Sequence, residues 1–165
     1  MGSSLFDLSG KIALITGSSQ GLGYVIGRGL AQAGAAVIIN GRDREKLDRA
    51  VSALSGEGLR AYGCAFDVTD SEQIRRSIPG VENEVGPIGI LVNNAGIQIR
   101  GPLETYEESS WRRIIENNLT SMFLVTRQVA PGMIARKSGK IINICSLQSE
   151  LGRPSIAPYA ASKGG

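Results

Sequence analysis

Lys11-Ile-Ala-Leu-Ile-Thr-Gly-Ser-Ser-Gln-Gly-Leu-Gly23 is the stretch from which the fold class can be read. Its first six residues are an apolar run typical of a strand, and a helical pattern at 22–33 follows and ends at Gly34. In the turn between them, Gly17 allows tight curvature, Gly21 lets the backbone approach a pyrophosphate, and Gly23 lets the helix pack on the strand. The unpaired N–H groups that open a helix favour negative charge, so the stretch predicts a phosphate-binding turn. A plain strand-to-helix turn is the alternative.

The same alternation of apolar runs and helical patterns continues along the chain. Further strands are expected at 36–40, 60–66, 88–92 and 140–145. Helices are expected after a capping Asp43, at 71–85 with a break near Pro79, at 111–136, and from about Pro158 onward. Strands that alternate with helices pair in parallel through right-handed crossovers. The sequence therefore predicts one α/β domain over residues 1–165, a doubly wound parallel (Rossmann) sheet in three αβα layers.

Composition narrows the class of protein. Hydrophobic residues make up 42% and charged residues 20% of the 165 residues, as in an ordinary globular domain. The net charge of +3 is scattered, which argues against nucleic-acid or membrane partners. The chain has no histidine, so no metal site is expected, and Cys64 and Cys145 are interpreted as buried free thiols in a reducing compartment. No signal peptide or membrane-length apolar run is found, and a cytoplasmic location is expected.

The end of the second expected strand, Asn40-Gly-Arg-Asp43, bears on the cofactor. Sites that prefer NAD place a carboxylate here, about 20 residues after the glycine turn, to hold the ribose hydroxyls. Gly41 takes that place in this chain, and Arg42 follows. A guanidinium pairs with a 2′-phosphate that a carboxylate would repel. The pattern therefore favours NADP, with NAD as the alternative and a solvated surface arginine as the other interpretation of Arg42.

A candidate catalytic pair lies near the end of the chain. Tyr159 and Lys163 are four residues apart, which places them on one face of a helix. A nearby ammonium stabilises a phenolate, so Tyr159 could act as general acid or base. Ser146 follows the fifth expected strand, where sheets of this class bind ligands, and could hold a substrate carbonyl oxygen. The pair by itself is a weak pattern, because this spacing often arises by chance.

Together these pieces resemble the short-chain dehydrogenase/reductase family, from about Leu8 onward. The matching pieces keep the family's order and spacing: the glycine turn at 16–23, Asp67, Asn93-Asn94-Ala95-Gly96, Asn118, Ser146 and the Tyr159–Lys163 pair. The resemblance implies hydride transfer between a substrate carbon and nicotinamide while Tyr159 passes the proton.

The resemblance also implies a role for single residues. Lys163 would bind the nicotinamide ribose, Asn118 would interrupt the long helix and hold a relay water, and Asp67 would hold the adenine. From the residues alone, Asn118 would be a helix-surface amide and Asp67 a turn residue before Thr69. The expected catalytic residues are Asn118, Ser146, Tyr159 and Lys163. The expected cofactor-binding residues are Gly17, Ser19, Gln20, Gly21, Leu22, Gly23, Arg42, Asp67, Val68, Asn94, Ala95, Gly96, Tyr159 and Lys163.

Within this family, the segments 5–11, 40–43, 95–98, 129–136 and 149–154 are similar to the gluconate 5-dehydrogenase group. That similarity implies interconversion of D-gluconate and 5-keto-D-gluconate. Arg100 and Arg153 are candidates for the substrate carboxylate, and Gln148 and Glu150 for its hydroxyls, beside Ser146 and Tyr159. Each loop residue also fits plain solvation. Gln20 stands where many NADP-using relatives carry arginine, which weakens the NADP preference without reversing it.

The family pattern continues beyond Gly165, so we expect a fold that lacks the last strands and a catalytic helix without the turns that fix it. An open apolar edge is expected at Ile141, Ile142 and Ile144. Two hypotheses stay open for the chain itself: part of an active dehydrogenase, or a catalytically inactive nucleotide-binding fragment. A 3-oxoacyl carrier-protein reductase-like ketoreductase is the alternative substrate class. A homodimer or homotetramer is expected of the full-length form, by resemblance.

Overall fold

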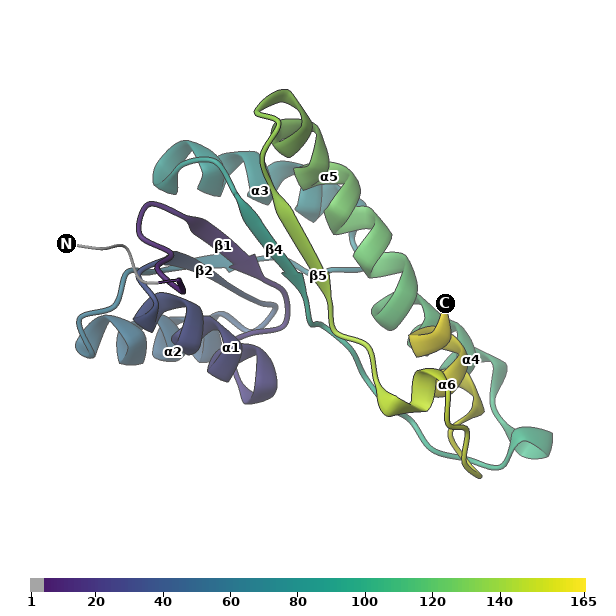
Figure 1. The fold of residues 1–165 in the computed structure, drawn as a ribbon. Helices are drawn as coiled ribbons and strands as arrows, with labels where there is room; N and C mark the ends of the chain where they lie inside the picture. Colours follow the sequence, from purple (N-terminus) through teal and green to yellow (C-terminus); the bar gives the residue numbers. More distant parts are fainter. Residues whose placement is uncertain (1–4) are drawn as a thin grey trace.

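The structure is a computed structural model and describes residues 5–165. Its five strands form one parallel sheet in the order β3-β2-β1-β4-β5 (Figure 1). The strands are β1 (Ile12–Ile15), β2 (Ala36–Gly41), β3 (Ala61–Ala65), β4 (Ile90–Asn93) and β5 (Lys140–Asn143). The helices are α1 (Gly21–Gln32), α2 (Arg44–Gly56), α3 (Ser71–Val85), α4 (Glu108–Ile115), α5 (Ser121–Ala135) and α6 (Ala157–Gly164), with the short turns η1 (Leu103–Thr105), η2 (Glu116–Thr120) and η3 (Leu147–Ser149).

Helices cover both faces of the sheet, which confirms the predicted doubly wound architecture (Figure 1). Side chains that alternate along a strand enter opposite layers. In β1, Leu14 packs in the cluster that includes Ile78 of α3 and Val125 of α5. Its neighbour Ile15 packs in the cluster that includes Leu54 of α2. The near-continuous apolar character of β1 thus follows from burial on both faces.

The strand order positions the functional site. After β1 the chain builds β2 and β3 on one side, and it then crosses back to place β4 and β5 on the other side. The connections that leave β1 and β4 therefore diverge at the carboxyl ends of these neighbouring strands. Open α/β sheets bind ligands in the crevice at such a switch point. None of the helices in the described part of the chain is long and apolar enough to span a membrane.

Two helices begin as the sequence predicts, and one differs from the prediction. Asp43 caps α2 by accepting a hydrogen bond from the Lys46 N–H at 3.1 Å. Asp70 caps α3 by accepting from the backbone N–H groups of Glu72 and Gln73. The break expected near Pro79 is absent, because α3 runs from Ser71 to Val85 through this residue. Pro79 lies on the exposed face, where water can pair the carbonyl that its missing N–H leaves free.

The long helix expected at 111–136 is divided into α4 and α5 by a π-helical turn, η2. Asn118 lies in this turn, so the interruption implied by the family resemblance is confirmed. π-helical turns are rare insertions in α-helices and concentrate at functional sites.

β5 is an edge strand of the described sheet, and all four of its residues are exposed. Ile141 and Ile142 are 42% and 46% exposed, as expected of an open apolar edge, whereas Ile144 is partly buried against the α1–α2 side of the core. The prediction that both cysteines are buried is wrong for one of them. Cys64 is buried, but Cys145 is exposed, because it follows this uncovered strand. Both thiols are free.

Candidate active site

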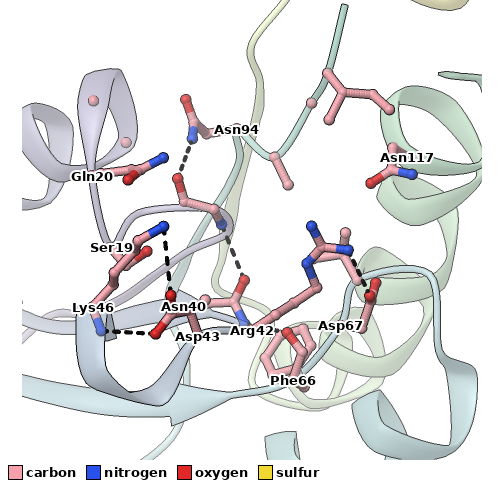
Figure 2. Close-up of a pocket in the computed structure, with 18 of the residues that line it drawn as sticks. Ser19, Gln20, Asn40, Arg42, Asp43, Lys46, Phe66, Asp67, Asn94 and Asn117 are labelled. Atoms are coloured by element: carbon pink, nitrogen blue, oxygen red, sulfur yellow. Dashed lines mark hydrogen bonds and ion pairs between the residues drawn. The ribbon is translucent and has the colours of Figure 1, made fainter. Parts of the chain in front are cut away.

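A cavity of about 460 Å³ lies at the carboxyl ends of the central strands (Figure 2). Its walls come from the glycine turn, the end of β2, the segment after β3 and the segment after β4. Every residue expected to hold the cofactor lines this cavity, apart from Tyr159 and Lys163. Its other lining residues are Asn40, Gly41, Asp43, Lys46, Phe66, Ile97 and Asn117.

The glycine turn is held against the segment that follows β4. Gly17 has a positive φ of 61°, and a Cβ there would lie 2.9 Å from the Ala95 Cα, so a side chain cannot fit. The Asn94 side-chain amide donates to the backbone carbonyls of Thr16 and Gly17, at 2.9 and 3.1 Å. A Cβ at Gly23 would collide with that same amide. Close packing of turn and helix therefore requires glycine at both positions.

Asn40 fixes the other side of the turn, a role that the sequence did not reveal. Its side chain is 1% exposed, and its Oδ1 accepts a hydrogen bond from the Gly17 N–H at 3.0 Å. Its Nδ2 donates to the carbonyls of Cys64 and Phe66, both at 3.1 Å. One amide thus joins the glycine turn to the end of β3. The one signal for this role in the sequence was an asparagine at the end of an otherwise apolar strand.

Arg42 extends along the cavity toward Asp67, as Figure 2 shows. Its Nη1 lies 3.2 Å from Asp67 Oδ2. The other carboxylate oxygen accepts from the N–H and hydroxyl of Thr69, at 2.8 and 2.7 Å. Partial burial alone would raise the pKa of Asp67, but the hydrogen bonds from Thr69 and the neighbouring Arg42 outweigh it and hold this pKa below 3.8. Asp67 is therefore a turn residue before Thr69 and also part of the cavity wall.

Tyr159 and Lys163 lie on α6, which is anchored more firmly than the sequence led us to expect. The Lys163 Nζ donates to the Ile144 carbonyl at 2.6 Å, and the Lys163 carbonyl accepts from the Ser149 hydroxyl at 2.7 Å. These contacts tie α6 to the segment after β5, so its two turns have a defined place. The Lys163 ammonium lies 6.0 Å from the centre of the Tyr159 ring. Burial lowers the pKa of Lys163, with the Cys145 thiol acting in the opposite direction.

Asn118 joins the cavity wall to α6. It is fully buried, so the helix-surface interpretation is wrong. Its Oδ1 accepts from the Ile97 N–H at 2.7 Å, and its Nδ2 donates to the Ile97 carbonyl at 2.9 Å and to the Ser162 hydroxyl at 3.0 Å. A Cβ on Gly96, which lines the cavity, would lie 3.3 Å from Asn118 Oδ1 and 3.7 Å from Lys163 Nζ. Two of the four predicted catalytic residues, Asn118 and Lys163, therefore both lie beside Gly96.

The expected substrate residues lie beyond the cavity, with Tyr159 on α6 and the others on the segments around it. Ser146 opens η3, which packs on α6, and its hydroxyl accepts from the Gln148 N–H at 3.1 Å. The Gln148 Oε1 is buried and has no hydrogen-bond partner within residues 5–165. Arg100, Glu150 and Arg153 are exposed. A hydrogen bond of 3.1 Å from the Gly101 N–H to the Ser155 carbonyl brings the two arginine-bearing loops together.

The sequence profile of the family described as short chain dehydrogenase matches residues 11–165. Among characterised proteins, the chain is 50% identical over 160 residues to a gluconate 5-dehydrogenase of Gluconobacter oxydans, covering 97% of this chain and 62% of that protein. It is 49% identical to a 5-keto-D-gluconate 5-reductase of Escherichia coli K12, covering 97% of this chain and 63% of that protein.

Solved structures agree with this family match. A gluconate 5-dehydrogenase from Burkholderia cenocepacia J2315, in complex with NADP and tartrate, superposes with a TM-score of 0.93 at 52% identity. The superposition covers 96% of this chain and 62% of that one. The chain therefore spans less than two thirds of the length of each of these three relatives.

Proposed function

Because the chain belongs to the short-chain dehydrogenase family, we propose that it is the cofactor-binding and catalytic part of an oxidoreductase that uses NADP. The reaction is the interconversion of a hydroxyl and a ketone, with D-gluconate and 5-keto-D-gluconate as the substrate pair. The observation that carries the proposal is one cavity bounded by the glycine turn and Arg42, whose wall at Gly96 adjoins both Asn118 and Lys163.

The cavity fits a dinucleotide. The N-terminus of α1, which begins at Gly21, opens on it. Apart from the chain neighbours of Gly21 and the backbone of α1, no atom of residues 5–165 lies within 4 Å of the place that a Gly21 Cβ would take. The backbone there can approach a pyrophosphate, whose charge is favoured by the N–H groups and dipole of the helix. Asp67 and Val68 would bound the adenine, and the 94–96 segment would lie along the nicotinamide half. When bound, the nicotinamide supplies hydride transfer.

The preference for NADP rests on the end of β2. No carboxylate stands at Gly41, and the adjacent Arg42 is 63% exposed at its side chain, so its guanidinium can reach a phosphate in the cavity. The Arg42–Asp67 ion pair is exposed on the arginine side, where water screens it, so a phosphate contact can replace it. A charge-assisted bidentate contact is stronger than that pair.

Tyr159 would exchange the proton with the substrate oxygen, and Ser146 would hold that oxygen. Lys163 supports this chemistry because its ammonium lies near the tyrosine ring and is fixed on the Ile144 carbonyl. Burial lowers the pKa of Lys163, and its position beside the Tyr159 ring would let it take part in the proton relay. Asn118 would hold the relay beside it, since its side chain is fixed by three hydrogen bonds in the π-helical turn.

A sugar acid is favoured as substrate by the two relatives described above and by the loops around α6. Arg100 and Arg153 come from loops that a backbone hydrogen bond joins, from Gly101 to Ser155, so the two arginines are carried by adjoining segments. A carboxylate would bind between or beside them, because guanidinium groups match its geometry. Gln148, whose buried Oε1 is a free acceptor in the described chain, and Glu150 would take hydroxyl groups of the sugar.

The test follows NADPH absorbance when 5-keto-D-gluconate is added, with a 3-oxoacyl thioester as the second substrate. We expect turnover with the keto acid, and loss of turnover but retained NADPH binding in Tyr159→Phe. Turnover with the thioester alone would instead support the ketoreductase class. That class includes a granaticin polyketide synthase putative ketoacyl reductase of Streptomyces violaceoruber, which is 42% identical over 156 residues. NADPH binding without turnover of either compound would support a nucleotide-binding module.

A further inference from the structure

A second cavity, of about 390 Å³, adjoins the nucleotide cavity between α1 and α2. Ser19, Gln20 and Lys46 belong to the walls of both cavities, and Lys46 is the one cation among residues 5–165 that lines both. The space therefore continues from the end of β2, past the glycine turn, onto the first turns of α2. We call the wall that the two cavities share, formed by Ser19, Gln20 and Lys46, the junction. An anion bound at the junction would lie between the two cavities.

The geometry of α2 holds Lys46 at the junction. Lys46 lies in the first turn of the helix, and its backbone N–H is tied to the Asp43 side chain by the cap. Its Nζ lies 3.5 Å from Asp43 Oδ2, with the two side chains 47% and 50% exposed. The hydrogen bond from the Lys46 N–H lowers the pKa of Asp43, so this carboxylate stays ionised at neutral pH.

The ion pair between Lys46 and Asp43 is weak and can be exchanged. Water screens exposed ion pairs and leaves them weak, whereas a phosphate monoester carries about −1.5 to −2 charges near neutral pH. The cap bond does not depend on the ammonium, because it uses the backbone N–H and the other carboxylate oxygen. Lys46 can therefore turn from Asp43 to a phosphate while α2 keeps its N-cap.

The opposite wall of the junction is shaped by Gly41 and Ser19. A Cβ at Gly41 would lie 2.8 Å from the Ser19 hydroxyl oxygen, so any larger residue at the end of β2 would displace Ser19. The serine hydroxyl thus occupies the approach to this junction as a neutral hydrogen-bond donor. Figure 2 shows Lys46 on the side of Ser19 and Asp43, whereas Arg42 extends toward Asp67. The two cations flank the end of β2 from different sides.

We propose that Lys46 is a specificity-determining residue of the site, a second cation that leaves Asp43 to bind the 2′-phosphate of NADP together with Ser19. This inference rests on the proposed use of NADP and adds a residue to it. Arg42 alone would contact the phosphate from one side, whereas Lys46 would add a second ionic contact from the α2 side.

The experiment measures the affinity of the 165-residue chain for 2′,5′-ADP and for 5′-AMP by NMR titration at low ionic strength. The two ligands differ by the 2′-phosphate alone. Lys46→Met keeps the apolar stem and removes the charge, Lys46→Arg keeps the charge, and Arg44→Met is the matched control. Arg44 lies in the same helical turn but lines neither cavity. Circular dichroism checks that each variant folds.

We expect Lys46→Met to weaken 2′,5′-ADP binding by about tenfold more than 5′-AMP binding, which corresponds to one charge-assisted contact. Lys46→Arg should restore most of that preference. If the preference for 2′,5′-ADP persists in Lys46→Met as it does in Arg44→Met, Lys46 has no such role although the NADP proposal stands. If the unmodified chain binds both ligands equally or binds neither, the NADP proposal is wrong. The Lys46 proposal is then wrong as well, because it depends on NADP binding.

Discussion

The side-chain amide of Asn40, at the end of β2, accepts a hydrogen bond from the Gly17 N–H at 3.0 Å. The two residues are 23 positions apart in the chain. Through this bond the second strand holds the glycine turn that follows the first, and the same side chain reaches the end of β3. Three of the segments that surround the cavity are thus joined by one buried amide.

Asn40→Ala should lower the free energy of unfolding by about 2–3 kcal/mol. The change leaves the Gly17 N–H and two buried carbonyls without their partner. Urea denaturation measures the effect, with Asn83→Ala, an exposed asparagine of α3, as the control that should shift stability by less than about 0.5 kcal/mol. Equal losses of unfolding free energy in the two variants would mean that the hydrogen bonds of Asn40 do not stabilise the fold.

Asn118→Ala should free the backbone of the segment after β4. Both the N–H and the carbonyl of Ile97 depend on this side chain. We expect faster amide hydrogen exchange at Ile97 and a stability loss of about 2 kcal/mol, since the groups left behind are partly buried. Asn117→Ala is the matched control, because within residues 5–165 the Asn117 side chain donates only to the Arg113 carbonyl, one helical turn away. Unchanged protection of Ile97 in Asn118→Ala would contradict the assigned contact.

The two thiols should differ sharply in reactivity. Burial, and the negative charge of Glu84 in addition, raise the pKa of Cys64 to about 12, while Cys145 is exposed. Because the thiolate is the reactive form, iodoacetamide at mildly alkaline pH should label the native protein once, at Cys145. Unfolding in urea should make both thiols available. Peptide mass mapping that finds Cys64 alkylated in the native protein would refute its burial.

Asp67 should stabilise the fold in a pH-dependent way. Its pKa in the folded protein lies below the ordinary aspartate value that the unfolded chain has, because Thr69 and Arg42 stabilise the charge, so the native state favours the ionised carboxylate. The stability it contributes is present above that value and is lost as the pH falls through the folded pKa. NMR titration of the Asp67 carboxyl measures this directly. Arg42→Ala should move its pKa upward, and a pKa at or above 3.8 in the unmodified protein would contradict the structure.

Arg42→Ala should weaken NADP binding by about tenfold and change NAD binding little, because only the 2′-phosphate needs the guanidinium. Fluorescence titration with NADPH and NADH gives both affinities. Arg60→Ala is the control, since Arg60 donates to the Gly34 carbonyl and does not line the cavity. Equal weakening of both cofactors would assign Arg42 a structural role instead of a phosphate contact.

Local patterns were sufficient to predict much of this structure. The apolar runs, Asp43 as a helix cap and Gly34 after a helix gave elements within a few residues of those observed. The glycine turn was recognisable because its spacing between a strand and a helix has few alternatives. Asn118 was placed in an interrupted helix only through the family resemblance, since nothing local distinguishes it from a surface amide.

The remaining errors share one physical cause, which is that burial depends on neighbours distant in the chain. Pro79 was expected to break a helix, but it lies on an exposed face where the lost hydrogen bond is tolerated. Cys145 was expected inside the core, but the strand before it is uncovered. The roles of Lys46 and Asn40 were not readable from a motif, because these residues reach the cavity only where β2 ends and α2 begins beside the glycine turn.

The order of residues along the chain thus specified the strands, the helices and the phosphate-binding turn, because each depends on contacts among near neighbours. The hydrogen bond between Asn40 and Gly17, the meeting of Asn118 with Lys163 beside Gly96, and the junction at Lys46 depended on the folded sheet. Parallel strands bring their carboxyl ends to one edge, so residues separated by tens of positions become neighbours there. Pairing across that distance leaves no periodic signal in a single sequence.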